Sequence, residues 1–195
     1  AARLGAKVAL VDEGVIAFRA ARGNFGLVWI ESNGANMPDY ARWSRRSAEL
    51  WPTLHEGMAE ATGVDVALQQ TGGYTFCLSE DEVQRRATLI ARMHNESGDI
   101  GTVMLDRAEL RARLPMVGDA VHGAAFCPLD GHANPLKLLR SLQDALLKSG
   151  GAYLPNRSVD RIDHAPGRFT VHSGAEAISS EKLVIAAGLG SAKLA

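Results

Sequence analysis

The first fourteen residues contain the feature that most restricts the fold, a helix end that leads directly into an apolar strand. Ala1–Leu4 has the composition of a last helical turn, and Gly5 follows it as a C-cap. Ala6–Val11 then predicts a buried strand, which ends at the polar turn Asp12–Gly14. A helix followed by a strand is the second half of a strand–helix–strand unit. We therefore expect a strand upstream of residue 1 and interpret the 195 residues as an internal piece of a longer α/β protein.

The remaining elements alternate less regularly. Cap and periodicity signals predict helices at about 38–63, 79–96, 106–114 and 134–150. Strands are predicted at 64–70, 73–78, 103–105, 121–126, 153–154, 158–163, 168–172 and 183–187. Strand–helix units at both ends with a strand-rich insert between them predict a discontinuous nucleotide-type α/β domain around part of a second domain.

Two further expectations concern packing. Residues 64–70 and 73–78 are expected to pair as a hairpin, because Thr71 and Gly72 form a turn signal between them. In the helix at 38–63, an apolar stripe at helical spacing is expected to face the core. Its members are Tyr40, Trp43, Leu50, Trp51, Leu54 and Met58.

Composition excludes several classes of protein. Hydrophobic residues make up 46% and charged residues 22% of the chain, which excludes intrinsic disorder. The net charge of −1 gives no electrostatic signal for nucleic acid or an anionic membrane, and no apolar run approaches the length of a membrane span. Cys77 and Cys127 are too few for a disulfide framework. We expect them to be buried thiols of a reducing compartment, the cytoplasm.

Asp12 is the most informative polar residue of the sequence. In a dinucleotide-binding unit, an acid at the end of the second strand accepts hydrogen bonds from ribose hydroxyls, about 20 residues after the glycine-rich turn. Counting back from Asp12 places that turn upstream of residue 1. The alternative is an ordinary acid at a strand end, without a ligand.

A glycine-containing loop follows within the long loop predicted at 15–34. Glycines let the backbone approach a ligand closely, and successive N–H groups in such a loop can bind phosphate or ring oxygens. Arg22 could add a bidentate phosphate contact, or it could be a solvated arginine of a simple turn. The candidate residues of this loop are Arg22, Gly23, Asn24, Phe25 and Gly26.

Two other segments offer weaker candidates. Ala187 and Gly188 are small residues after the predicted strand 183–187, where they would let a ligand approach the carboxyl end of a strand. His132 could carry a proton, although a local hydrogen-bonding role is the alternative. His164 and His172 could be neighbours on a hairpin. The histidines and cysteines have no metal-ligand spacing, so no metal is expected.

Together, and in this order, five segments resemble the FAD-dependent oxidoreductases of the D-amino-acid oxidase family. The resemblance is strongest to the branch of glycine and sarcosine oxidases, with the flavin subunits of opine dehydrogenase and hydrogen cyanide synthase. The segments that carry it are KVALVDEG (7–14), RGNFGLVW (22–29), DGHANPLKLLRSL (130–142), SVDRI (158–162) and LVIAAGLGS (183–191).

The resemblance implies a fold and a set of cofactor contacts. It implies an α/β fold with a Rossmann-like FAD-binding domain, discontinuous over 1–63 and 129–195 and lacking its first strand and glycine-rich loop. Residues 64–128 would be part of an α+β substrate-binding domain. By the resemblance, Asp12 binds the adenosine ribose, Arg22 to Leu27 run beside the pyrophosphate and flavin, and the backbone of Val159 meets the adenine. Ala187 and Gly188 would pack against the cofactor, and no catalytic residue is identified.

The function implied by the resemblance is oxidation of the C–N bond of a small amino acid or secondary amine by hydride transfer to FAD. The electron acceptor would be oxygen or a partner subunit, and the isolated piece is expected to be inactive. Two alternatives stay open. The chain could be a non-catalytic remnant of the same fold that no longer binds FAD, or a flavoprotein of that fold acting on a hydroxy acid.

Overall fold

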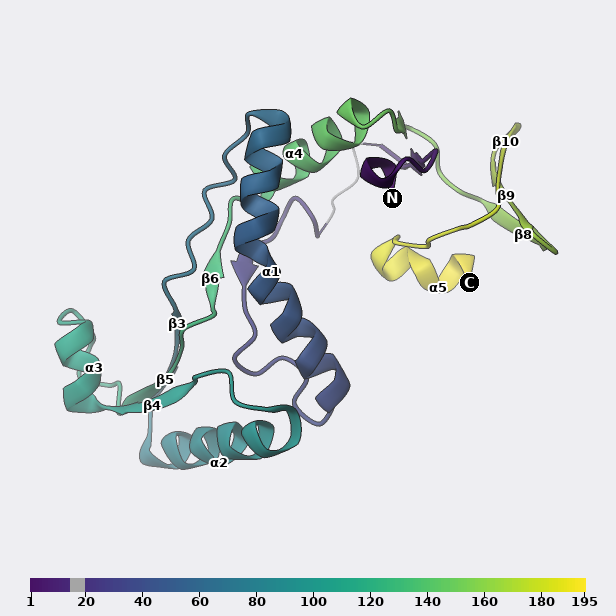
Figure 1. Ribbon diagram of the computed structural model, residues 1–195. Coiled ribbons are helices and arrows are strands. Elements are labelled where there is room, and N and C mark those ends of the chain that lie inside the picture. Colours follow the sequence, from purple (N-terminus) through teal and green to yellow (C-terminus); the bar gives the residue numbers. More distant parts are fainter. Residues whose placement is uncertain (15–19) are drawn as a thin grey trace. The chain divides into compact units, whose positions relative to one another are not determined.

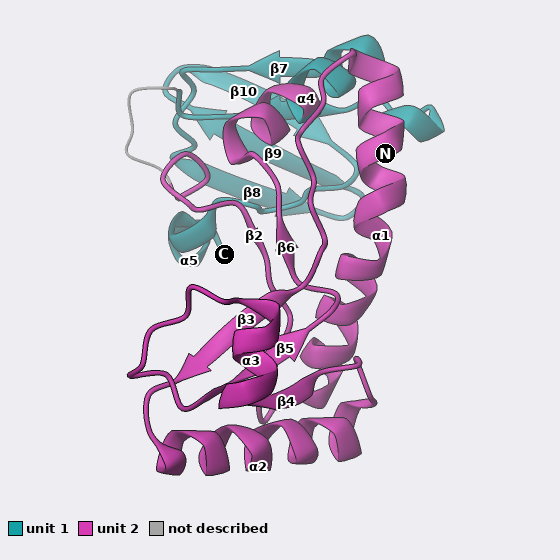
Figure 2. Cartoon of the chain, turned by 90° about the vertical axis from the view of Figure 1, so that its left-hand side faces the viewer, with its two compact units in different colours: residues 1–19, 142–195 teal, residues 20–141 magenta. Residues whose placement is uncertain are grey.

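The computed structural model describes residues 1–14 and 20–195 (Figure 1). Of the predicted loop at 15–34, residues 15–19 therefore lie outside the described residues. The chain divides into two compact units (Figure 2), which we call unit 1 (residues 1–19 and 142–195) and unit 2 (residues 20–141). The division that we predicted from cofactor and substrate roles, at 63/64 and 128/129, concerns function and stays a prediction.

Unit 2 contains the long helix α1, Pro38–Thr62, with the ends that the sequence predicts. Pro38 occupies the beginning of the helix, where a missing N–H is tolerated, and Gly63 ends it in the left-handed conformation at φ 74°. The predicted apolar stripe is a core face only in part: Met58 is buried and Trp51 packs against two core clusters, whereas Trp43 is 69% exposed. The buried residues of α1 are Ala48 and Met58, because those positions meet the apolar residues near Val28 and Val66.

A proline lies inside α1, and a side chain from outside the helix compensates for it. Pro52 has no N–H, so the carbonyl of Ala48 four residues earlier loses its helical donor. The side-chain amide of Gln70 donates to the oxygen of Ala48 at 3.1 Å and to the oxygen of Leu129 at 3.0 Å. Gln70 therefore ties the middle of α1 to the turn after strand β5.

Three antiparallel strands of unit 2 form a sheet in the order β3 (Gly73–Cys77), β5 (Gly123–Cys127), β4 (Val103–Asp106). Leu105 and Ala124 lie opposite each other and pack with Leu110 of α3, Arg107–Arg113. Side chains alternate between the faces of a sheet, so Gly123 lies on the other face, close to Val83 of α2, Glu80–Ser97. The two helices thus cover opposite faces.

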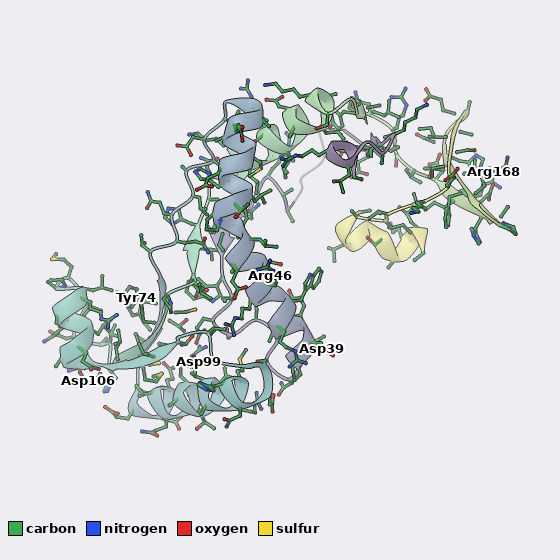
Figure 3. The ribbon with its side chains drawn as sticks, viewed as in Figure 1. Asp39, Arg46, Tyr74, Asp99, Asp106 and Arg168 are labelled. Atoms are coloured by element: carbon green, nitrogen blue, oxygen red, sulfur yellow. The ribbon has the colours of Figure 1, made fainter. Side chains whose placement is uncertain are left out.

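The predicted caps of α2 and α3 are present. Ser79 accepts a hydrogen bond from the N–H of Glu82, and the Glu82 carboxylate accepts from the N–H of Leu78. Asp106, labelled in Figure 3, forms both bonds of a capping box with Glu109. These local interactions fix where each helix begins.

The predicted hairpin of 64–70 with 73–78 is wrong. Strand β3 pairs with β5, and residues 64–70 contribute one bridge, between Gln69 and His132. The physical reason is a turn at Asp65, whose carboxylate accepts from the N–H of Ala67 at 2.7 Å while Ala67 adopts a positive φ of 54°. A β-strand cannot continue through a residue with a positive φ, so the strand predicted at 64–70 does not form.

A short antiparallel ladder, β2 (Leu27–Val28) with β6 (Gly131–His132), follows the candidate loop. The sequence did not predict either strand. Helix α4, Pro135–Lys148, begins directly after β6, and the side chain of Asn134 caps it by accepting from the N–H groups of Leu136 and Lys137. This cap and the first-turn proline agree with the prediction.

Unit 1 contains the two-stranded parallel sheet of β1 (Ala9–Val11) and β7 (Ala152–Leu154). It also contains the antiparallel sheet β10 (Glu176–Ser180), β9 (Arg168–Ser173), β8 (Arg161–Ala165). The terminal helices are η1 (Ala2–Leu4), η2 (Gly188–Gly190) and α5 (Ser191–Leu194). Gly5 caps η1 at φ 81°, as predicted.

Two strand predictions in unit 1 need correction. Residues 183–187 form no strand, and β1 is shorter than the predicted strand 6–11 and not buried. A strand needs backbone partners on its edges, and among the described residues β1 pairs with β7 alone. His164 and His172 are not neighbours either, since their register positions lie on opposite faces of the β8–β9 pair.

No helix in the described parts of the chain is both long and apolar enough to span a membrane.

Candidate functional site

Asp12 stands at the carboxyl end of β1, in unit 1. Its backbone is fixed on both sides: its N–H donates to the oxygen of Leu154 at 3.1 Å, and its own oxygen accepts from the N–H of Arg157 at 2.9 Å. The carboxylate accepts from the N–H of Gly14 at 2.8 Å and from the hydroxyl of Tyr153 at 3.4 Å. The strand end therefore presents an oriented acceptor group, as ribose recognition requires.

The turn after Asp12 requires glycine. Gly14 has a positive φ of 113°, and a Cβ there would lie 2.3 Å from the side-chain oxygen of Asn156. A side chain at residue 14 would therefore both strain the backbone and displace Asn156. The tight turn keeps the Asp12 carboxylate close to the strand end.

The candidate loop in unit 2 is held by its own asparagine. The amide of Asn24 donates to the oxygens of Ala20 and Ala21, each at 3.0 Å, and its oxygen accepts from the N–H of Gly26 at 2.7 Å. Asn24 thus shapes the loop from within. Phe25 is 90% exposed, and Leu27 is exposed as well.

Gly26 is the point of closest approach between this loop and the beginning of α4. Its φ is 71°, and a Cβ would lie 1.9 Å from the oxygen of Ala133 and 2.9 Å from Cδ of Pro135. The N–H of Ala133 donates to the oxygen of Gly26 at 2.8 Å, which continues the β2–β6 ladder by one bond. Only glycine fits at residue 26, while residues 22–25 and Leu27 on either side of it are exposed.

Two buried acidic residues, Asp130 next to β6 and Glu31 three residues after β2, were not singled out by sequence reasoning. Asp130 is fully buried, and its carboxylate accepts from the N–H of Ile30 at 2.6 Å. Glu31, also buried, pairs with Arg86 at 3.2 Å and accepts from the hydroxyl of Thr75 at 3.4 Å. Burial raises the pKa of Asp130 to about 6, and the negative charge of Glu31 acts in the same direction. An aspartate next to a turn glycine resembles an ordinary turn in sequence, so nothing marked it as buried.

The other predicted site residues are exposed or half-buried. Val159 is half-buried and precedes β8, while Ala187 and Gly188 are exposed, and Gly188 begins η2 with φ 56°. His132 is exposed; its backbone pairs with Leu27 and Gln69. Within the described residues, no group of three or more histidine, cysteine or acidic side chains could hold a metal ion.

The structure therefore groups the predicted site residues by unit. Unit 1 carries Asp12, Val159, Ala187 and Gly188, and unit 2 carries Arg22, Gly23, Asn24, Gly26 and Leu27. Within unit 2, Gly26 lies against Ala133 and Pro135 at the start of α4, and Asp130 binds the N–H of Ile30, three residues after Leu27. Cofactor contact by these residues stays a prediction.

Comparison with known proteins covers the whole chain. A family model described as FAD dependent oxidoreductase matches residues 1–195. An opine oxidase subunit of Agrobacterium tumefaciens (strain Ach5) is 37% identical over 201 residues, and its counterpart from Rhizobium meliloti is 38% identical over 197. Each match covers 100% of this chain and 53% of the relative. The chain thus spans about half the length of these curated relatives.

Solved structures agree with the family match. The crystal structure of glycine oxidase from Bacillus cereus ATCC 14579 superposes with a TM-score of 0.83 at 27% sequence identity. The match covers 99% of this chain and 52% of that chain. The mixed α/β fold predicted from the sequence is thereby confirmed.

Proposed function

The chain belongs to the family of FAD-dependent oxidoreductases, and from this premise we propose that the whole protein oxidises the C–N bond of a small amino acid or secondary amine. The observation that carries the proposal is the similarity along the entire chain to proteins named as opine oxidase subunits and glycine oxidase. Fold alone would not support a substrate class, because one fold hosts many reactions.

The residues present fit FAD. The Asp12 carboxylate is oriented at the end of β1 by the N–H of Gly14, and residues 22–25 and Leu27 are exposed, so both segments proposed for cofactor contact are accessible to a ligand. When bound, FAD supplies the two-electron acceptor for the hydride that leaves the carbon next to nitrogen.

The chain's own residues would bind and orient the cofactor. We assign to Asp12 the ribose hydroxyls, to Arg22, Gly23, Asn24, Gly26 and Leu27 the pyrophosphate and flavin, and to the backbone of Val159 the adenine. Ala187 and Gly188 would let the cofactor approach closely, since they have no bulky side chains. The division into a FAD-binding part (1–63, 129–195) and a substrate part (64–128) belongs to the same proposal.

The proposal also covers the electron acceptor and the cellular location. We propose oxygen or a partner subunit as electron acceptor; the second option is supported by relatives that are named as subunits. A cytoplasmic location is supported by Cys77 and Cys127, two buried free thiols whose pKa is raised by burial. We also propose that the 195 residues alone bind FAD too weakly for catalysis.

The test is flavin reduction in the whole protein. It is purified, its visible spectrum is recorded, and it is mixed without oxygen with glycine, sarcosine, N-carboxyalkyl amino acids and hydroxy acids. We expect the flavin bands to bleach with one class of amine and not with hydroxy acids. Absence of flavin would contradict the family-level function in this protein, and bleaching by hydroxy acids alone would contradict the substrate class.

A matched pair of variants tests the assigned role of Asp12. Asp12→Ala removes the proposed ribose acceptor, whereas Asp163→Ala removes an exposed carboxylate of the β8 strand in the same unit. We expect Asp12→Ala to weaken FAD binding roughly tenfold or more in equilibrium dialysis, and Asp163→Ala to leave it unchanged. Equal affinities of the two variants would remove Asp12 from the site.

A further inference from the structure

The ladder that positions the candidate loop is unusually short. Two residue pairs form it, Leu27 with His132 and Val28 with Gly131. A shift of one residue would turn Leu27 to the opposite face, and two pairs give little backbone energy to prevent it. The bond from the N–H of Ala133 to the oxygen of Gly26 extends the ladder at one end, so a further interaction is needed at the end toward Ile30.

Asp130 supplies a further bond at the end where the ladder stops. It directly precedes β6, and its side-chain oxygen accepts from the N–H of Ile30, two residues after β2. The bond is 2.6 Å long and fully buried, and it joins residues 100 positions apart. The side chain thus takes the place of the backbone carbonyl that a longer β6 would offer.

The turn that carries Asp130 is itself held from several sides. The N–H of Gly72 donates to the oxygen of Asp130 at 3.0 Å, and Gln70 donates to the oxygen of Leu129 at 3.0 Å. A Cβ on Gly131 would lie 2.1 Å from the oxygen of Gln69, so this turn packs directly against neighbouring backbone. Asp130 is therefore a fixed reference point, and Ile30 is the group that it locates.

The residue after Ile30 is anchored as well. Glu31 forms its buried ion pair with Arg86 of α2 and accepts from Thr75 of β3. The segment that leaves β2 is thus bound on consecutive residues, first to the β5–β6 turn and then to the sheet and its helix.

Stability alone does not account for a carboxylate at residue 130. Its second oxygen, Oδ2, is buried and accepts no hydrogen bond from the described residues. A buried charge with an unsatisfied oxygen costs free energy. The benefit lies in the bond that the other oxygen makes to Ile30.

We propose that Asp130 is a positioning residue that fixes the register of β2 against β6, and so holds Gly26 and Leu27 in the orientation that contacts the flavin. The role toward flavin rests on the proposed function. The role toward β2 does not, because it follows from contacts inside unit 2.

The test compares three variants in the whole protein. Asp130→Asn keeps an oxygen acceptor for Ile30, Asp130→Ala removes it, and Leu110→Ala is a destabilised control in the core on α3, away from β2. Hydrogen exchange of the peptide covering residues 27–30 reports the ladder, while FAD affinity and the visible circular dichroism of bound flavin report the site.

We expect Asp130→Ala to speed exchange in residues 27–30 and to weaken FAD binding roughly tenfold or more, with a changed flavin dichroism. Asp130→Asn should restore the exchange pattern and the dichroism, and bring FAD affinity to within about threefold of wild type. Leu110→Ala should lower stability while leaving the flavin signals unchanged.

Three results would overturn the proposal: unchanged exchange at residues 27–30 in Asp130→Ala, equal defects in the Asn and Ala variants, or the same flavin changes in Leu110→Ala. If Asp130→Ala does not fold, hydrogen exchange in the wild-type protein is the test. The proposal requires the Ile30 amide to exchange as slowly as the amides of β5, and faster exchange at Ile30 would overturn it. A wild-type protein without FAD contradicts the proposed function, while the exchange data still test the register.

Discussion

Unit 2 and unit 1 are both rich in apolar residues but differ in how many they bury. Unit 2 contains three clusters of buried residues, around Val28, Leu110 and Met58. Among the described hydrophobic residues of unit 1, Val171 alone is buried, whereas Leu10 and Ile185 are exposed. A hydrophobic segment therefore becomes a core strand only where the same unit provides partner strands and a covering layer.

The largest expected effect tests this difference directly. Leu110→Ala in unit 2 should lower the free energy of unfolding by about 3 kcal/mol, because a fully buried leucine leaves a cavity. Leu10→Ala in unit 1 should cost less than about 1 kcal/mol, since the side chain is exposed. Urea unfolding followed by tryptophan emission measures the first change, since Trp29, Trp43 and Trp51 all lie in unit 2.

Hydrogen exchange at the buried Val171 measures the effect of Leu10→Ala on the stability of unit 1. Equal losses of stability for the two variants would remove the distinction between the units.

The second effect concerns the buried acid of unit 2. The pKa of Asp130 is about 6 in the folded chain, against 3.8 for an ordinary aspartate, so the folded state binds the proton more tightly. The stabilisation that comes from this tighter proton binding is therefore complete below pH 4 and is lost as the pH rises through 6. Relative to Asp130→Asn, the wild-type unfolding free energy should fall by up to about 3 kcal/mol between pH 4 and pH 7.

Tryptophan-detected urea unfolding at several pH values measures that difference. The groups facing Asp130 include Glu31, which the Asn variant retains, so the comparison isolates Asp130 itself. A constant difference between the two proteins across this range would show that Asp130 keeps an ordinary pKa.

The smallest effects compare one local interaction from each unit. Asp106→Ala removes the helix cap of α3 in unit 2 and should cost about 1 kcal/mol. Glu176→Gln breaks the 2.6 Å ion pair with Arg157 in unit 1. Because the Glu176 carboxylate is largely exposed, this variant should change the free energy of unfolding by less than about 0.5 kcal/mol. Thermal unfolding of both variants gives the order, and a larger loss for Glu176→Gln would contradict it.

Local signals predicted much of unit 2. The first residues of α1, α2, α3 and α4 follow from Pro38, Ser79, Asp106 and Asn134, because a first-turn proline or a side-chain cap acts within three positions along the chain. The β5 strand was also predicted to within two residues.

Predictions that depend on distant partners fared worse. Residues 183–187 have the composition of a buried strand and form none, because a strand depends on neighbours that sequence periodicity does not identify. β2 and β6 are too short to show a period at all. For the same reason Asp130 was not recognised, since its partner Ile30 lies 100 residues away. The family match supports the predicted cofactor, while the individual contacts rest on experiments such as those above.

Pro52 and Gln70 also have a consequence for how this sequence can change over evolutionary time. The proline removes a donor from the Ala48 carbonyl, and the glutamine amide replaces it. Loss of Gln70 should therefore be far more harmful with proline at 52 than with alanine there, which makes the two positions epistatic. The two substitutions also have a preferred order. A lineage that acquires Gln70 before Pro52 passes through no intermediate in which the Ala48 carbonyl lacks a donor.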